Sequence, residues 1–235
     1  NTIEETAYFL HLTVHTEKPV ILTGSMRPST ALSPDGPMNL YQAVSLASRE
    51  EGKGMGVMVV FADAIYSARD VQKVSTFKTD AFHSRDFGCL GYMKEEIPYF
   101  FQKPLKKHTY VSEFSTEGIT TLPKVSIAYF HSGADPEILD YMADHYAGIV
   151  IAGCGIGSYS ESWRWKVKDL EEKGIPVVRA SRTQNGIIVR PKIIEKSNNV
   201  IPANTLSPQK AKILLQLALT QTKDYDAIRT LFLQY

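Results

Sequence analysis

Residues 23–40, which read TGSMRPSTALSPDGPMNL, join a short apolar strand to a helix, and this connection indicates an α/β fold. The preceding run Val20-Ile21-Leu22 is apolar and mostly β-branched, as expected of a strand buried on both faces of a sheet. Asp35-Gly36-Pro37 predicts a helix start, because a capping carboxylate stands ahead of a proline. Ligands of open α/β sheets bind beyond the carboxyl ends of the strands, so we expect Gly24 to Arg27 on the rim of a small-molecule site. A purely structural loop is the alternative interpretation.

The charges of the chain are nearly balanced, with 26 Lys and Arg residues against 25 Asp and Glu residues in 235. A net charge of +1 gives no overall field that would attract nucleic acid or an anionic membrane. No apolar run reaches the length needed to span a bilayer, and the two cysteines are too few for a disulfide framework or a zinc site. Composition therefore predicts a globular protein with a sizeable core and with no nucleic-acid or membrane partner.

A second buried strand, VMVVFA, is predicted at residues 57–62 after a glycine-rich turn. A strand, a helix and a strand in succession imply a parallel pair with a right-handed crossover. The next segment, residues 63–73, is then expected to return as a loop to the same edge of the sheet as residues 24–27. Two short runs at residues 91–93 and 97–101 predict a hairpin that completes this unit.

The segment from Lys103 to Pro123 carries basic, hydroxyl and glycine residues without periodicity, which favours a connection between two domains. Beyond it strands and helices alternate again, as in a second doubly wound unit. We therefore expect the remainder of an N-terminal α/β domain at residues 1–102, a linker at 103–123 and a C-terminal α/β domain at 124–235. The linker lysines are interpreted as solvated, because aromatic residues that would stack nucleic-acid bases are sparse there.

The chain opens on a helix signal, because Thr2-Ile3-Glu4-Glu5 has the form of a capping box. A domain normally begins with exposed residues that tolerate loss. This start therefore predicts that an upstream strand and turn are missing and that the N-terminal domain is incomplete. A helix at a natural terminus is the alternative interpretation.

Two features of the chain are candidates for chemistry on their own. Lys73 ends the predicted rim loop, where a partly desolvated lysine can accept a proton, although a solvated surface lysine is the alternative. Residues 153–158, GCGIGS, lie between a strand and a helix, like a cradle for a nucleotide phosphate. Ser158 stands where the dinucleotide motif has its third glycine, so a turn used for tight packing or for anion binding is favoured.

Histidine and tryptophan residues give weaker signals. His11 and His15 are four residues apart and share a helix face, but without a third ligand a solvated surface is favoured over a metal site. No histidine belongs to a recognisable motif with a nucleophile. Trp163 and Trp165 fall on different faces of their helix and are interpreted as packing or interface residues.

The chain is similar to the bacterial L-asparaginase family, and most closely to its type II members, in the stretches NTIEETAYFLHLTV, GSMRPSTALSPDGPMNL, VMVVFADAIYSARDVQK and LSPQKAKILLQLALTQTKD. The resemblance implies two α/β domains and an amidohydrolase that converts L-asparagine to L-aspartate and ammonia, with activity on L-glutamine in many members. It also implies a homotetramer that uses no metal or organic cofactor. The implied location is periplasmic or cytoplasmic, with type II members favouring the periplasm.

The resemblance also assigns site residues. The family motif Gly-Thr-Asp-Thr is represented only by its last two positions, so Asn1 falls at the catalytic and substrate-binding aspartate and Thr2 at the final threonine. Lys73 matches the lysine that moves protons together with this motif. Ser25 and Met26 match the substrate-binding rim, where a backbone carbonyl faces the side-chain amide of the substrate.

Two further positions concern the neighbouring subunit. Glu195 matches a substrate-binding glutamate that reaches into the partner's site, and Ile156 stands where type II members often carry a supporting asparagine. The nucleophilic threonine of the family belongs to a segment expected to precede Asn1, so the 235 residues alone are expected to be inactive. Because Asn1 offers no charge to a substrate ammonium, a non-catalytic homologue that binds an amino acid or acts as a scaffold is the alternative.

Overall fold

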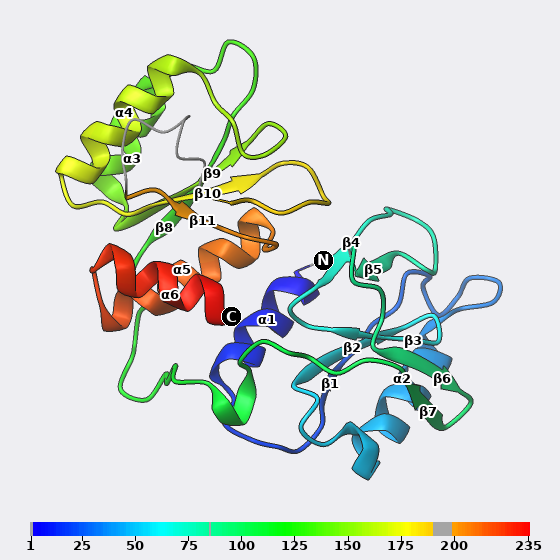
Figure 1. Cartoon of the computed structure of the whole chain (residues 1–235). Helices are drawn as coiled ribbons and strands as arrows, with labels where there is room; N and C mark the ends of the chain where they lie inside the picture. Colours follow the sequence, from blue (N-terminus) through cyan, green and yellow to red (C-terminus); the bar gives the residue numbers. More distant parts are fainter. Residues whose placement is uncertain (1, 85, 190–198) are drawn as a thin grey trace. The chain divides into compact units, whose positions relative to one another are not determined.

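The computed structural model describes residues 2–84, 86–189 and 199–235, so Asn1 and Glu195 lie outside the described residues (Figure 1). The chain divides into two compact units, unit 1 at Asn1–Ser115 and unit 2 at Thr116–Tyr235. Each unit has its own sheet and its own hydrophobic core, which confirms the predicted α/β fold class. The finer boundaries expected from the sequence, with a linker at 103–123, remain a prediction.

The larger sheet of unit 1 has the strand order β1-β2-β3-β6-β7, and β4 and β5 form a separate two-stranded sheet. β1 and β2 are parallel, as predicted, whereas every other strand pair described in this unit is antiparallel. The elements of unit 1 are α1 (Ile3–Thr13), β1 (Val20–Leu22), α2 (Gly36–Ala47), a 3₁₀ helix (Glu50–Gly52), β2 (Val57–Phe61), β3 (Ala64–Ser67), β4 (Val71–Lys73), β5 (Phe82–Ser84), β6 (Gly91–Lys94), β7 (Ile97–Phe100) and a second 3₁₀ helix (Thr109–Val111).

The prediction of a loop at residues 63–73 is wrong, because this segment contains β3 and β4. Ala62 and Asp63 have positive φ angles of 48° and 67°, the backbone conformation of a two-residue hairpin turn. The chain therefore turns back along β2 immediately instead of crossing over. The predicted hairpin at residues 91–101 is confirmed as β6 and β7.

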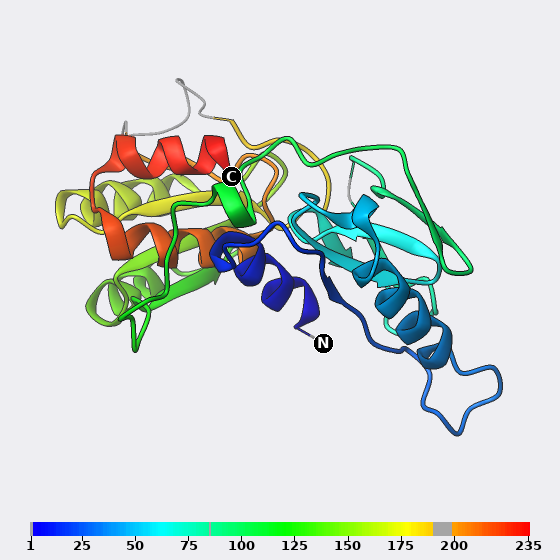
Figure 2. The same cartoon turned by 90° about the horizontal axis from the view of Figure 1, so that it is seen from below.

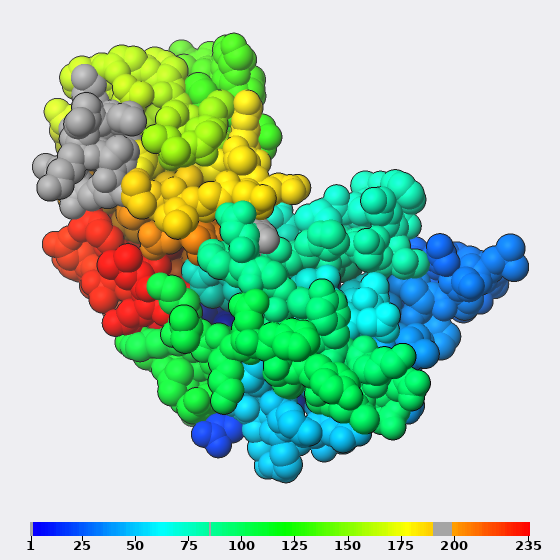
Figure 3. All heavy atoms as spheres, turned by 45° about the vertical axis from the view of Figure 1, so that its right-hand side comes forward, coloured from blue at the N-terminus to red at the C-terminus, as the bar shows by residue number. Residues whose placement is uncertain are grey.

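The loop between β1 and α2 stands out from the body of unit 1 next to α2 (Figure 2). The same loop forms a projection in the space-filling view (Figure 3), and its residue Leu32 is 94% exposed. The predicted helix after this loop is confirmed as α2, with Asp35 at its N-cap position and Pro37 in its first turn. The side chain of Asp35, however, makes no capping hydrogen bond to this helix.

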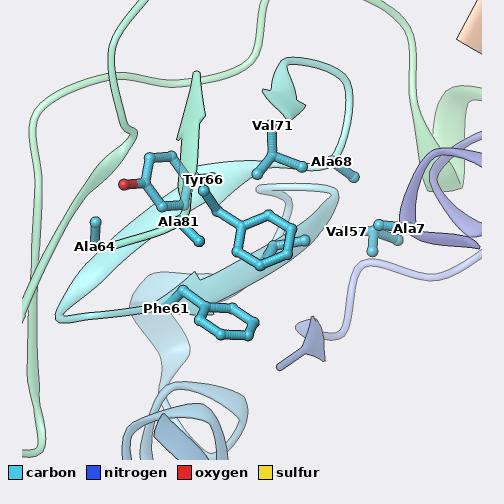
Figure 4. Close-up of a cluster of buried hydrophobic side chains, with 10 residues drawn as sticks. Ala7, Val57, Phe61, Ala64, Tyr66, Ala68, Val71 and Ala81 are labelled. Carbon is cyan, nitrogen blue, oxygen red and sulfur yellow. The ribbon is translucent and has the colours of Figure 1, made fainter. Parts of the chain in front are cut away.

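Alternate side chains of β2 enter two different cores of unit 1, as the two-residue period of a strand requires. Val57, Val59 and Phe61 join a cluster that includes Ala7 of α1 and Val71 of β4 (Figure 4). Met58 and Val60 join a second cluster with Leu46 of α2. The sheet of unit 1 is thus packed on one side by α1 and on the other by α2.

The first part of the expected linker packs onto α1. The Ser112 hydroxyl donates to the Leu12 carbonyl, and a ring nitrogen of His15 lies 2.7 Å from the Phe114 carbonyl oxygen. Phe114 itself is buried, with 1% of its surface exposed. Residues up to Ser115 are therefore part of the body of unit 1.

Unit 2 has a four-stranded sheet in the order β11-β10-β9-β8, in which all described pairs are parallel. Helices α3 and α4 lie on one face of this sheet, and α5 and α6 on the other (Figure 1), as predicted for a doubly wound unit. Its elements are β8 (Val125–Tyr129), α3 (Glu137–His145), β9 (Gly148–Gly153), α4 (Glu161–Glu172), β10 (Val177–Ser181), β11 (Ile201–Pro202), α5 (Pro208–Gln221) and α6 (Tyr225–Gln234).

The two tryptophans of α4 have different surroundings. Trp163 is 1% exposed and its indole N–H donates to the Ala134 carbonyl at 3.0 Å, so it is a core residue of unit 2. Trp165 is 50% exposed. Only Trp165 remains a candidate interface residue of this pair. Among the described helices, none combines the length and the apolar composition that a membrane crossing needs.

Candidate active site

The rim loop begins where β1 ends, and contacts with β2 fix its first residues. The Thr23 hydroxyl donates to the Val60 carbonyl at 2.7 Å. A Cβ atom added to Gly24 would lie 3.3 Å from the Phe61 ring, so the backbone passes close to that side chain. Ser25 is exposed, whereas Met26 is partly buried against the cluster that contains Phe61. The rim loop thus lies directly over the end of β2.

Asp35 folds the rim loop back on itself. One carboxylate oxygen accepts the N–H of Arg27 at 2.8 Å, and the other accepts the N–H of Met26 at 2.9 Å. Burial alone raises the pKa of Asp35, but the hydrogen bonds from Met26, Arg27 and Asn39 outweigh it and hold the pKa below its ordinary value. The sequence suggested only a helix cap here, since nothing in the sequence shows that the loop returns to this carboxylate.

Two buried amides of α2 connect this loop to the β2–β3 turn. The side-chain N–H₂ of Asn39 donates to the Gly24 carbonyl at 3.0 Å and to Asp35 at 3.1 Å, and its oxygen accepts the Ala62 N–H at 3.1 Å. Gln42 donates to the carboxylate of Asp63 at 2.6 Å. Sequence reasoning missed both amides, although two amides on the otherwise apolar buried face of a helix are a signal that it could have used.

Lys73 lies on β4 rather than on a loop, and its backbone pairs with Phe82 of β5. Its ammonium nitrogen is 5.9 Å from the centre of the Phe82 ring, and the rings of Phe82 and Phe61 are 4.5 Å apart between centroids. Phe61 in turn contacts the backbone at Gly24. Two aromatic side chains in contact, with their rings tilted by 36°, therefore lie between Lys73 and the start of the rim loop.

The start of α1 is held beside the same strand. The backbone N–H of Lys73 donates to the carboxylate of Glu4 at 3.1 Å. Thr2 immediately precedes this helix, and its carbonyl accepts the backbone N–H groups of Glu5 and Thr6. Its side chain makes no capping hydrogen bond, so the reciprocal capping box expected from the sequence does not form. The hydrogen bond to Glu4 thus holds the first turn of α1 beside Lys73, and Met26 packs on the cluster that also contains Ile3 and Phe82.

The glycine-rich segment of unit 2 forms a closed turn. Cys154 and Ser158 exchange backbone hydrogen bonds of 2.8 and 2.7 Å, and the Ser181 hydroxyl donates to the Gly155 carbonyl. A Cβ atom added to Gly157 would lie 2.8 Å from a side-chain carbon of Arg179. Because the turn is closed by its own backbone groups, the packing interpretation is supported. Ile156, at its tip, is 53% exposed.

The prediction that His11 lies on a solvated helix surface is wrong. His11 is 1% exposed, and its Nδ1 accepts the Val57 N–H at 3.1 Å. His15 follows the end of α1 and contacts Phe114 instead. Across the three ranges that the structure describes, no three histidine, cysteine, aspartate or glutamate side chains gather in a way that would hold a metal ion.

Comparison with known proteins decides the family. Residues 1–106 match the family model described as Asparaginase, N-terminal, and residues 124–232 match the Glutaminase/Asparaginase C-terminal domain. The chain belongs to the asparaginase family. It is 46% identical to Glutaminase-asparaginase of Acinetobacter glutaminasificans over all of this chain and 72% of that protein. It is 44% identical to L-asparaginase 2 of Bacillus subtilis over all of this chain and 62% of that protein.

A solved asparaginase has nearly the same structure. It is described as a probable cytoplasmic L-asparaginase from Campylobacter jejuni, with a TM-score of 0.96 and 45% identity over all of this chain and 75% of that one. The chain thus spans 62 to 75% of the length of these three asparaginases. The asparaginase fold of both units, predicted from the sequence, is therefore confirmed.

Proposed function

We propose that the full-length protein is an amidohydrolase that hydrolyses L-asparagine to L-aspartate and ammonia, with a side activity on L-glutamine. The observation that carries this proposal is the match of the whole chain to asparaginases named for these two reactions. Two parts of the predicted site in unit 1 also lie in well-defined structure. The rim loop is held by hydrogen bonds to Asp35, and Lys73 belongs to β4. The alternative of a non-catalytic homologue is not favoured by these relatives.

In the proposed reaction, a threonine hydroxyl attacks the side-chain amide carbon and forms an acyl-enzyme, ammonia leaves, and water then releases L-aspartate. The resemblance assigns this threonine to a segment that would precede Asn1 in the full-length protein. Backbone N–H groups stabilise the developing oxyanion.

Lys73 is proposed to accept and return the proton of this reaction together with Thr2. The hydrogen bond from the Lys73 N–H to Glu4 supports this pairing, because it holds the start of α1 beside β4. Asn1 is proposed to contact the substrate ammonium, Ser25 and Met26 its side-chain amide, and Glu195 the site of a partner subunit. The full-length protein is further proposed to be a homotetramer with a periplasmic or cytoplasmic location, as the family resemblance implies.

Ammonia release tests the proposed function. The full-length protein should release ammonia from L-asparagine faster than from L-glutamine, and the Lys73→Met variant should lose most of this activity. Loss of a positioned proton acceptor lowers kcat by about a hundredfold or more. The matched control is Lys78→Met, which removes an exposed lysine elsewhere in unit 1. A full-length protein that is silent on both amides would overturn the proposal.

A further inference from the structure

The Asp35 carboxylate holds the rim loop at a particular peptide bond. It accepts the Met26 N–H, and this N–H belongs to the same planar peptide group as the Ser25 carbonyl. In a trans peptide the N–H and the C=O point in opposite directions. Asp35 therefore fixes the direction of the Ser25 carbonyl, which points away from the carboxylate.

Asn39 acts in the same way on the preceding peptide. Its N–H₂ group donates to the Gly24 carbonyl, which shares a plane with the Ser25 N–H. Asn39 also donates to Asp35 and is 2% exposed, so its own orientation is fixed. Both peptide planes that flank Ser25 are thus set by one hydrogen-bonded pair of side chains at the start of α2.

The polar backbone groups of Ser25 are available to another molecule. In the described part of the chain, neither its N–H nor its C=O makes a hydrogen bond, and the residue is exposed on the rim. The neighbouring groups behave differently, because the Met26 and Arg27 N–H groups and the Gly24 carbonyl are bound by the side chains of Asp35 and Asn39. The loop therefore presents the Ser25 carbonyl in an orientation that Asp35 fixes.

We propose that Asp35 and Asn39 are positioning residues that aim the Ser25 carbonyl at the side-chain amide of the substrate. This inference rests on the proposed function. The charge of Asp35 matters because a carboxylate accepts three N–H groups here, two from the backbone and one from Asn39. An asparagine at this position has one oxygen and would direct an N–H₂ group at another donor.

The test compares kinetics of the full-length protein with those of Asp35→Asn. We expect kcat/KM for L-asparagine to fall by about tenfold to a hundredfold, mostly through kcat, because the scissile amide is misplaced. The ratio of kcat/KM for L-glutamine to that for L-asparagine should also shift by about threefold or more, since the two amides reach the carbonyl differently. A loss of folded protein would lower both activities equally and leave this ratio unchanged.

Two variants and one structural readout complete the experiment. Asp35→Glu keeps the charge but displaces the loop, and should shift the substrate ratio even if Asp35→Asn folds poorly. Asp224→Asn is the matched control, because Asp224 is the N-cap of α6 and accepts the Ala227 N–H far from the rim loop in sequence. Hydrogen exchange of the Met26 and Arg27 amides should be faster in both Asp35 variants and unchanged in Asp224→Asn.

The outcomes separate this inference from the proposed function. If the unaltered protein releases no ammonia, the proposed function fails, and the exchange rates alone then decide whether Asp35 fixes the loop. If the protein is active but both Asp35 variants keep the original substrate ratio and kcat, the positioning role is overturned. Unchanged exchange at Met26 and Arg27 would overturn it as well.

Discussion

The imidazole of His108 is buried in unit 1, 5.1 Å from the ring of His11 and 5.8 Å from the ring of Tyr110 between centroids. Burial lowers the pKa of His108 below its ordinary value of 6.5. The unfolded chain then binds the proton more readily than the folded chain does. The free energy of unfolding should therefore fall as the pH drops below about 6.5 and should level off below the folded-state pKa.

Urea unfolding of the full-length protein should show this dependence, with a lower midpoint at about pH 5.5 than at about pH 7.5. One such group changes the free energy of unfolding by at most about 1.4 kcal/mol per pH unit. The variant His108→Gln should reduce the change of the urea midpoint with pH. The control is His131→Gln, which replaces an exposed histidine of unit 2. If the urea midpoint of His108→Gln changed with pH as much as that of the unaltered protein, His108 would not be the cause of the pH dependence.

A second prediction concerns a single residue, Asn1, and rests on the family resemblance. A charge-assisted hydrogen bond to the substrate ammonium contributes on the order of 1.5–3 kcal/mol. Asn1→Asp in the full-length protein should therefore raise kcat/KM for L-asparagine by about tenfold or more. The gain should be absent with succinamate, which lacks the ammonium group. An unchanged value for L-asparagine would show a pocket adapted to the amide of Asn1.

At the scale of an element, the turn between β9 and α4 depends on glycine. Gly157 has a φ angle of 84°, and an added Cβ would lie 2.8 Å from Arg179 and 2.9 Å from the Ala180 carbonyl oxygen. Gly155 also has a positive φ, of 52°, but an added Cβ there meets no atom within 4 Å. A comparison of alanine substitutions at the two glycines therefore separates the free-energy cost of the backbone conformation from that of a steric clash.

Gly155→Ala should destabilise the protein by about 1 kcal/mol through backbone strain alone. Gly157→Ala should cost about 2–4 kcal/mol, because the same strain is joined by overlap with Arg179 and Ala180. The urea midpoints of the two variants measure this difference. Equal midpoints would show that the turn relaxes without loss of packing.

Some of the strands could be predicted from the sequence and others could not. Long apolar runs such as Val57–Phe61 are visible without any partner, and they were predicted correctly as strands. β3 and β4 were missed because they are short, and because β4 pairs with β5 rather than with the larger sheet. Their identity depends on pairing partners that local periodicity does not show.

The position of a rim at Gly24 to Arg27 and the candidate Lys73 could be predicted from the element pattern, because ligands bind beyond the carboxyl ends of strands. The roles of Lys73, Ser25 and Met26 came from resemblance, whereas Asp35 was interpreted as a simple cap. His11 was assigned to a solvated surface because its partner, the Val57 N–H, is 46 residues away in the chain. Hydrogen bonds between distant segments decide these roles, and the sequence alone does not show them.

At the level of the whole molecule, we expect a homotetramer in which a neighbouring subunit completes each site. Trp165 is a candidate interface residue, because it is half exposed on α4. Light scattering on the full-length protein at micromolar concentration should give about four times the mass of one subunit. A monomer under these conditions would contradict the assembly, and a monomer that is fully active would also contradict the shared site.

The proposed reaction of the full-length protein cleaves the side-chain amide of L-asparagine. The most direct measurement follows L-asparagine that carries a heavy-nitrogen label in this amide, with nuclear magnetic resonance of the products. We expect labelled ammonium and unlabelled L-aspartate in equal amounts, and neither product with Lys73→Met. Unreacted L-asparagine, or ammonium released without the label, would contradict it.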